Sequence, residues 1–219
     1  MNLRERFVDS IQSVTPGYKL VPKEDSRLMK FLAIILFFNG DFMSRYTTTV
    51  GSTVYMPKDH ISSGTRNLST LAHEAQHVWD HNRWYGHIFY AVGYILPQVL
   101  ALGALLSLLA IWFSNWWLLA LLSLVFLAPI PAPARMAIER RGYLMSLACE
   151  WWMYGRDGVS EYTWPVDNFA SGDYYWMWPF RKGLVSWFVS ELEQIKSGSY
   201  PTPVFKVVHE FLKSENLTK

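Results

Sequence analysis

Apolar residues recur at helical spacing along most of the chain and predict a mainly helical protein. Within residues 2–14, Leu3, Phe7 and Ile11 fall on one helical face, and Pro16–Gly17 ends the pattern. This first segment predicts a packing helix that carries no evident chemistry. Further helices are predicted at residues 135–148, 184–196 and 203–213.

Between the first helix and the middle of the chain, the pattern predicts one more helix and one β segment. The helix begins near Glu24, includes the apolar residues 31–38 and ends at Asn39–Gly40. Residues 46–57 are rich in β-branched and aromatic side chains and predict a strand or hairpin that Pro57 ends. Such a strand either binds a peptide along its free edge or only packs, and the sequence leaves both alternatives open.

The pattern changes at residues 88–134, which contain no Asp, Glu, Lys or Arg. Two apolar arms, 88–113 and 116–127, are joined by Ser114–Asn115 and predict a membrane hairpin of two helices. The second arm would be only about 18 Å long as a helix, against a hydrocarbon core of about 30 Å. The hairpin therefore either crosses the bilayer, dips into one leaflet or packs against partner subunits.

A zinc-binding motif precedes the hairpin, on a helix that begins near Asn67. His73 and His77 are four residues apart, so their side chains lie on one helical face and can bind a single zinc ion. Glu74 would lie beside that ion, where it could take a proton from a zinc-bound water. The alternative is an amphipathic helix that carries two surface histidines.

Glu139 is the predicted third ligand, because a hairpin that returns to its starting point would bring it beside His73 and His77. In the alternative, Glu139 pairs with neighbouring arginines on a solvated face. Glu150 is the reserve ligand, and Asp173 is a weaker alternative.

The order of these features resembles the integral-membrane zinc peptidases of the HtpX and CAAX prenyl protease type, which are gluzincins. The shared features are the motif at residues 71–77, two apolar segments, and then an arginine and Glu139 at the start of a helix. The resemblance covers roughly residues 45–150. The chain departs from that family at Tyr143, where the family usually has an aspartate that holds a ligand histidine. It also lacks the family's two transmembrane helices before the motif.

The resemblance implies a zincin-like α+β fold, one Zn²⁺ ion per chain and an active site that faces the cytoplasm. The implied site residues are His73, His77 and Glu139 as metal ligands and Glu74 as general base. Tyr143 and His81 are the candidates, by proximity, for stabilising the oxyanion, and Tyr143 is the one predicted as catalytic. His81 is otherwise predicted to lie near the ion without binding it, or on the surface.

These features together predict a membrane-associated zinc metalloendopeptidase. The predicted fold is mainly α with a small β-sheet, and the hairpin is inserted between the zinc-binding helix and the helix that carries Glu139. The chain then divides into the two halves of a catalytic domain, residues 1–87 and 135–219, and the hairpin at residues 88–134. The rival prediction is a non-catalytic structural or interaction protein that keeps a zincin fold within a larger assembly, such as a membrane complex or a phage particle.

The charges around the hairpin predict where the protein is located. Arg83 precedes the hairpin and Arg135, Arg140 and Arg141 follow it, so the positive-inside rule places both ends in the cytoplasm. The predicted location is the inner (cytoplasmic) membrane, with the catalytic part facing the cytoplasm. The predicted partners are the lipid bilayer and a peptide or protein substrate.

The composition narrows the partners and the type of metal ligand. With 20 basic and 18 acidic side chains the net charge is +2, which argues against nucleic acid as a partner. The single cysteine, Cys149, excludes an internal disulfide and predicts a site without sulfur ligands. Aromatic residues make up 16% of the chain, and those of residues 150–180 predict a substrate cleft, a lipid surface or a protein partner.

Overall fold

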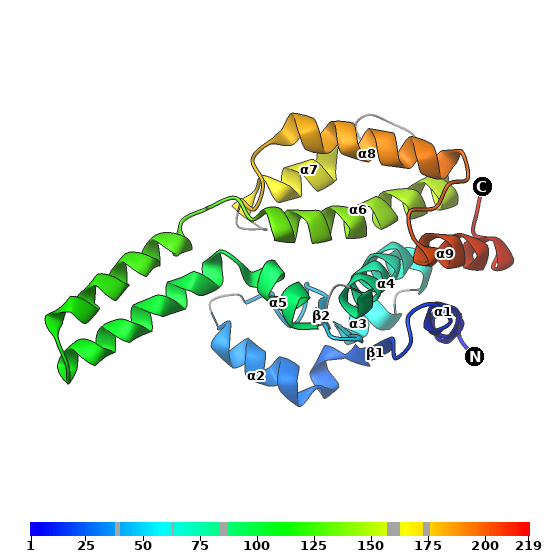
Figure 1. The fold of residues 1–219 in the computed structure, drawn as a ribbon. Helices are drawn as coiled ribbons and strands as arrows, with labels where there is room; N and C mark the ends of the chain where they lie inside the picture. The colour runs from blue at the N-terminus through cyan, green and yellow to red at the C-terminus, as the bar shows by residue number, and fades with distance from the viewer. Residues whose placement is uncertain (38–39, 63, 84–86, 157–162, 173–175) are drawn as a thin grey trace.

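The computed structural model of the chain shows a body of helices around a small sheet, with a long arm that projects from it (Figure 1). It describes residues 1–37, 40–62, 64–83, 87–156, 163–172 and 176–219. The α-helices are α1 Leu3–Gln12, α2 Arg27–Ile35, α3 Lys58–Ser62, α4 Leu68–Arg83, α5 His87–Ile95, α6 Pro133–Tyr154, α7 Thr163–Phe169, α8 Arg181–Lys196 and α9 Pro203–Ser214. The 3₁₀ helices are η1 Lys23–Asp25, η2 Gly64–Asn67, η3 Gln98–Ile111 and η4 Asn115–Leu127, and the strands are β1 Lys19–Pro22, β2 Thr48–Val50 and β3 Thr53–Met56.

The mainly helical character and the small sheet agree with the prediction from the sequence. Helices α6, α8 and α9 cover the segments predicted as helices at residues 135–148, 184–196 and 203–213, and α1 and α2 lie inside their predicted ranges. The strand or hairpin predicted at residues 46–57 is confirmed, because β2 and β3 pair antiparallel around Gly51, whose φ of +61° suits glycine.

The sheet has the strand order β1-β3-β2, so β2 forms one edge. The central strand β3 pairs parallel with β1 and antiparallel with β2. Val54 and Met56 of β3 are fully buried, whereas the residues of β2 are intermediate or exposed. The outer edge of β2 therefore has backbone N–H and C=O groups that form no hydrogen bonds with another strand of the sheet.

The core of the body is the contact between α4 and α6, which lie side by side (Figure 1). Leu71, Ala75 and Val78 of α4 and Met145 and Ala148 of α6 are fully buried. Small residues on both helices let their backbones approach closely, and each helix carries polar residues into the contact. The candidate metal ligands lie on these two helices.

A buried chain of polar groups joins α4, α6 and α9. Arg141 Nη2 of α6 lies 3.0 Å from Asp80 Oδ1 of α4, and the same oxygen accepts a 3.0 Å hydrogen bond from Gln76 Nε2. Gln76 Oε1 in turn accepts a 2.8 Å hydrogen bond from Thr202 Oγ1, directly before α9. Asp80 and Gln76 are fully buried, so these hydrogen bonds offset the cost of removing their polar groups from water.

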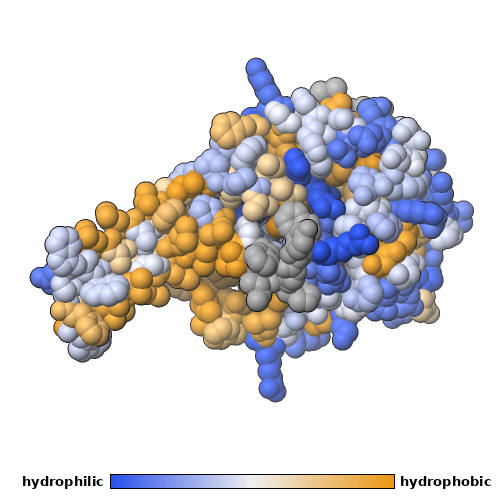
Figure 2. Space-filling model, viewed as in Figure 1, coloured by the Kyte–Doolittle hydropathy of each residue, from blue (hydrophilic) through white to orange (hydrophobic). Residues whose placement is uncertain are grey.

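The apolar arm, residues 98–127, consists of η3 and η4, which pack against each other and project beyond the body (Figures 1 and 2). Leu102 and Leu105 of η3 and Leu122 of η4 are more than half exposed, and Ala101 is the arm's buried residue. The arm therefore presents apolar surface on both of its helices, as Figure 2 shows.

The prediction of a membrane hairpin is wrong for this structure. None of the helices in the described part of the chain combines the length and the apolar character needed to cross a bilayer. The segment is broken into α5, η3 and η4, which contain 9, 14 and 13 residues, whereas a transmembrane helix needs about 20. The apolar residues of the sequence continue across these breaks, so the apolar pattern alone does not show where the helices end. The predicted inner-membrane location, with its catalytic part facing the cytoplasm, rested on the same hairpin and is wrong as well.

The packing of α1 on α9 can be tested by substitution of Phe7. Its ring is fully buried and meets Phe211 of α9 edge-on at 5.2 Å, so Phe7→Ala should lower the free energy of unfolding by about 3–5 kcal/mol. Urea unfolding followed by circular dichroism measures this loss. Phe31→Ala on α2 is the matched control, because Phe31 is 59% exposed and the loss there should stay near 0.5 kcal/mol or less. Equal losses at the two positions would contradict this packing.

Candidate metal centre

Helix α4 places His73 and His77 on the face that packs against α6. Their rings meet edge-on, with centroids 4.6 Å apart, and their Nε2 atoms are 2.9 Å from each other. Because four residues make about one helical turn, the two imidazoles stack along the helix and direct the same ring nitrogen to one point.

Glu139 of α6 lies at that point. Its Oε2 atom is 3.7 Å from His73 Nε2 and 3.6 Å from His77 Nε2, and the residue is only 3% exposed. Glu139 and the two histidines are the group in the described part of the chain whose ligand atoms could hold a metal ion. The chain that leaves the body through α5 thus returns Glu139 to the helix that carries the histidines.

The three atoms fit the coordination geometry of zinc. Zinc–ligand bonds of about 2.0–2.1 Å in a tetrahedron separate neighbouring ligand atoms by about 3.3 Å, and the three observed separations lie on both sides of that value. Two imidazoles and one carboxylate are a ligand set that catalytic zinc sites use, with the fourth position left for water. The residues therefore fit a catalytic zinc ion better than a structural one, which has four protein ligands.

Neighbouring side chains orient two of the three ligands. Tyr94 of α5 donates a 2.6 Å hydrogen bond to Glu139 Oε1, which leaves Oε2 facing the histidines. Arg135 holds this tyrosine in turn, because its Nε donates a 2.7 Å hydrogen bond to the Tyr94 carbonyl. His73 Nδ1 lies 3.3 Å from Ser146 Oγ, a contact that favours the metal-binding tautomer at Nε2.

The electrostatics of the site favour a carboxylate between two imidazoles. Burial alone would raise the pKa of Glu139, but the charge of His77 and the nearness of both histidines hold that pKa well below its usual range. Burial likewise lowers the pKa of His77, yet the nearby Glu139 carboxylate raises it to about 9. The buried Glu139 carboxylate thus favours a positively charged partner beside it.

The ligands line a cavity of about 680 Å³ between β2 and α5. Residues 47–51 form one wall, and Ala91, Val92 and Ile95 are apolar positions of the other. Glu74 also lines this cavity, and its Oε2 accepts a 2.6 Å hydrogen bond from Thr49 Oγ1 of β2. The glutamate of the motif therefore shares one cavity with the ligand atoms and the edge strand.

The structure places the other sequence candidates at different distances from this cavity. His81 lines it and packs edge-on against Tyr90. The ring of Tyr143 meets His73 edge-on at 4.9 Å, but its hydroxyl accepts a hydrogen bond from Asn168 and it is not part of the cavity lining. Its predicted catalytic role stays a prediction. Glu150 lies farther along α6 and pairs with Arg156, and Asp173 is outside the described residues.

Tyr90 and Tyr94 are the cavity residues that the sequence analysis missed. Both lie in the segment that was interpreted as membrane hairpin, where tyrosines were counted with the apolar residues. The signal available in the sequence was that these two tyrosines, within the uncharged segment, are four residues apart and so share one helical face.

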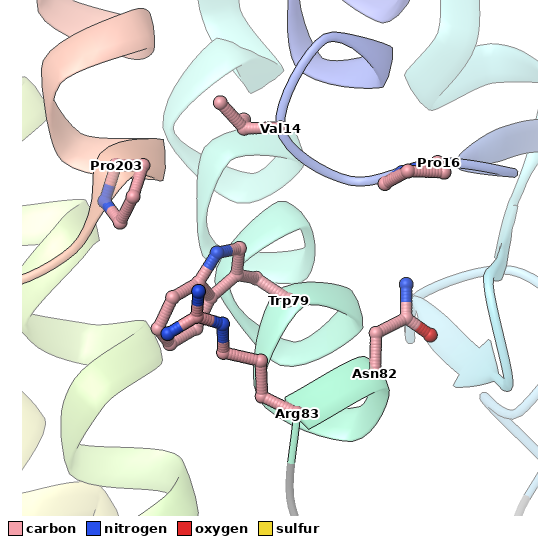
Figure 3. A pocket seen from close by; sticks show the side chains of 6 residues that line it. All are labelled: Val14, Pro16, Trp79, Asn82, Arg83 and Pro203. Carbon is pink, nitrogen blue, oxygen red and sulfur yellow. The ribbon is translucent and has the colours of Figure 1, made fainter.

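A second cavity, of about 510 Å³, lies beside the C-terminal turns of α4 (Figure 3). It is lined by Val14, Pro16, Trp79, Asn82, Arg83 and Pro203. The Arg83 guanidinium lies over the Trp79 ring, 4.7 Å from its centroid. No His, Cys, Asp or Glu is among these described lining residues, so this cavity offers none of the usual metal ligands.

Comparisons with protein-family models, with curated proteins and with solved structures found no match to the chain. The resemblance to gluzincin peptidases thus stays a prediction that rests on the order and spacing of residues.

Tyr94→Phe tests whether the hydrogen bond to Glu139 matters for metal binding. Loss of an outer hydrogen bond to a ligand typically weakens metal binding by about 10–100-fold, and zinc affinity should fall by that amount. Competition with a chromophoric chelator measures it. Tyr90→Phe is the matched control, because it removes a hydroxyl from the same cavity but no hydrogen bond to Glu139; its affinity should match the wild type. A wild-type affinity in Tyr94→Phe would contradict the role of this hydrogen bond.

Gly142→Ala tests the closeness of α6 to the ligand His73. A methyl group at Gly142 would lie 2.6 Å from His73 Nε2, the candidate metal-binding atom, so the imidazole must move away. Zinc content measured by mass spectrometry should fall to a small fraction of the wild-type value. Gly183→Ala on α8 is the control, since a methyl group there meets nothing within 4 Å and zinc should be retained. Equal zinc contents in the two variants would refute the close approach.

Proposed function

We propose that the protein is a zinc-dependent metalloendopeptidase that binds one Zn²⁺ ion per chain through His73, His77 and Glu139. The convergence of these three side chains, from two helices far apart in the sequence, carries the proposal. Glu74 supports a hydrolytic role, because it lines the same cavity and is not used as a ligand.

When bound, zinc would polarise the carbonyl of the substrate and lower the pKa of a water molecule at the open position. Glu74 serves as the general base that takes a proton from the attacking water, and later delivers it to the leaving amine. Thr49 holds one oxygen of Glu74 by its 2.6 Å hydrogen bond, so the carboxylate keeps a defined direction in the cavity. Tyr90, on the cavity wall, carries a hydroxyl that can donate a hydrogen bond to a substrate oxygen, and the ring of His81 lines the same cavity.

The walls of the cavity support a peptide substrate. The edge strand β2 lines the cavity beside Glu74, and an extended peptide can add to such an edge through main-chain hydrogen bonds. Among the described residues of the lining there is no Lys or Arg to pair with a terminal carboxylate. We therefore propose cleavage inside a chain, with apolar side chains of the substrate against the wall of α5.

A second candidate function follows from the apolar arm. Exposed apolar residues on both of its helices favour an interaction protein that works within a larger assembly. Exposed Trp164, Trp176 and Phe180 offer a further surface for a protein partner, within the aromatic segment 150–180. In this candidate the metal centre would stabilise the α4–α6 contact without turning over a substrate.

Glu74→Gln separates the two candidates. The amide cannot act as a base, so cleavage of a quenched-fluorescent unfolded protein should fall on the order of 10²–10⁴-fold. Zinc content should stay at one ion per chain, because Glu74 is not a ligand. Full cleavage activity in Glu74→Gln would contradict the mechanism, and a zinc-loaded wild type that cleaves nothing would favour the interaction protein.

A further inference from the structure

Two buried polar atoms on α4 have no hydrogen-bond partner within the described part of the chain. They are His77 Nδ1, on the ring whose Nε2 faces Glu139, and Oδ2 of Asp80. His77 and Asp80 are three residues apart, so they lie on neighbouring turns of the same helical face. One atom belongs to an imidazole that can donate a proton, and the other is a carboxylate acceptor.

We propose that Asp80 is the positioning residue of the metal ligand His77. Its Oδ2 accepts the hydrogen bond of His77 Nδ1–H, directly or through one buried water, and thereby fixes the tautomer that binds metal through Nε2. The inference rests on the proposed metal centre and assigns Asp80 a role there that the motif alone does not give.

The surroundings of Asp80 suit this role. Arg141 and Gln76 both use Oδ1, so the carboxylate is held in place while Oδ2 stays available. The residue is fully buried, where an oxygen without a donor is costly and bulk water cannot supply one. A single hydrogen bond from His77 Nδ1 to Asp80 Oδ2 gives each of these two buried atoms the partner that it lacks.

The two histidines also differ in a way that calls for such a partner. His73 Nδ1 lies beside Ser146 Oγ, at 3.3 Å, whereas the equivalent atom of His77 has no protein partner in the described residues. Metal-binding histidines almost always donate their other ring N–H to a carboxylate, a carbonyl or a water, and this contact increases the basicity of the ligand. Asp80 is the carboxylate of α4 placed to do so.

Asp80 also joins three helices, so a test must separate metal binding from stability. Asp80→Asn keeps the shape of the side chain. The amide oxygen of the new asparagine must still accept hydrogen bonds from Arg141 and Gln76. The amide NH₂ group therefore faces His77. A donor then faces the donor Nδ1–H, and His77 changes to the tautomer whose Nε2 carries the proton. Zinc affinity, measured with zinc alone against a chromophoric chelator, should fall about 10–100-fold.

Thr202→Val is the matched control. It breaks the outer end of the same polar chain, the hydrogen bond to Gln76, without changing the carboxylate. Both variants should unfold more easily than the wild type, but Thr202→Val should keep the wild-type zinc affinity. Equal affinities in Asp80→Asn and Thr202→Val would overturn the positioning role.

A measurement on the wild type keeps the proposal testable if Asp80→Asn does not fold. In the zinc-loaded, ¹⁵N-histidine-labelled protein, His77 should give an Nδ1–H resonance that exchanges slowly with water. Zinc bound at one ion per chain together with a rapidly exchanging or absent His77 Nδ1–H would overturn the role of Asp80 and leave the proposed function standing. A wild type that binds no zinc would overturn both.

Discussion

The burial of the Glu139 carboxylate is the constraint on which the site and much of the fold depend. A carboxylate with 3% exposure is stable only where positive charge and hydrogen bonds replace the water it has lost. Here His73 and His77 face one oxygen, and Tyr94 donates to the other. The Glu139 carboxylate thus contacts both α4 and α5 and holds α6 against them. Oε2 of Glu139 and the two imidazole nitrogens converge on the one point that the proposed zinc ion would occupy.

The helices of the body pack so that the Glu139 carboxylate of α6 lies beside the two histidines of α4. Gly142 lets α6 approach the ring of His73, because any larger side chain would collide with it. Asp80 and Gln76 extend the polar face of α4 toward Arg141 and α9, so the contact holds the elements that frame the site. The base of the arm completes the arrangement, since α5 supplies Tyr94 and one wall of the cavity.

The parts of the site that could be predicted from the sequence are those set by local spacing. Two histidines at i and i+4 meet on any helix, and a β-rich segment before them forms a strand wherever it can pair. The return of Glu139 followed from the two apolar segments, although these are the arm's 3₁₀ helices and not a bilayer-spanning pair. The positions at which a helix breaks depend on the local backbone geometry. The number of apolar residues in a segment therefore does not predict them. The hydrogen bond from Tyr94 to Glu139 and the ion pair of Asp80 with Arg141 join different helices, so no local pattern indicates them.

The central claim is that His73, His77 and Glu139 form one zinc site with an open position. X-ray absorption at the zinc K-edge, on wild-type protein with one equivalent of zinc, tests it directly. The predicted spectrum has four light ligands at about 2.0–2.1 Å, with the multiple-scattering signature of two imidazoles and no sulfur. A zinc ion coordinated by six oxygens, or by fewer than two imidazoles, would contradict the account.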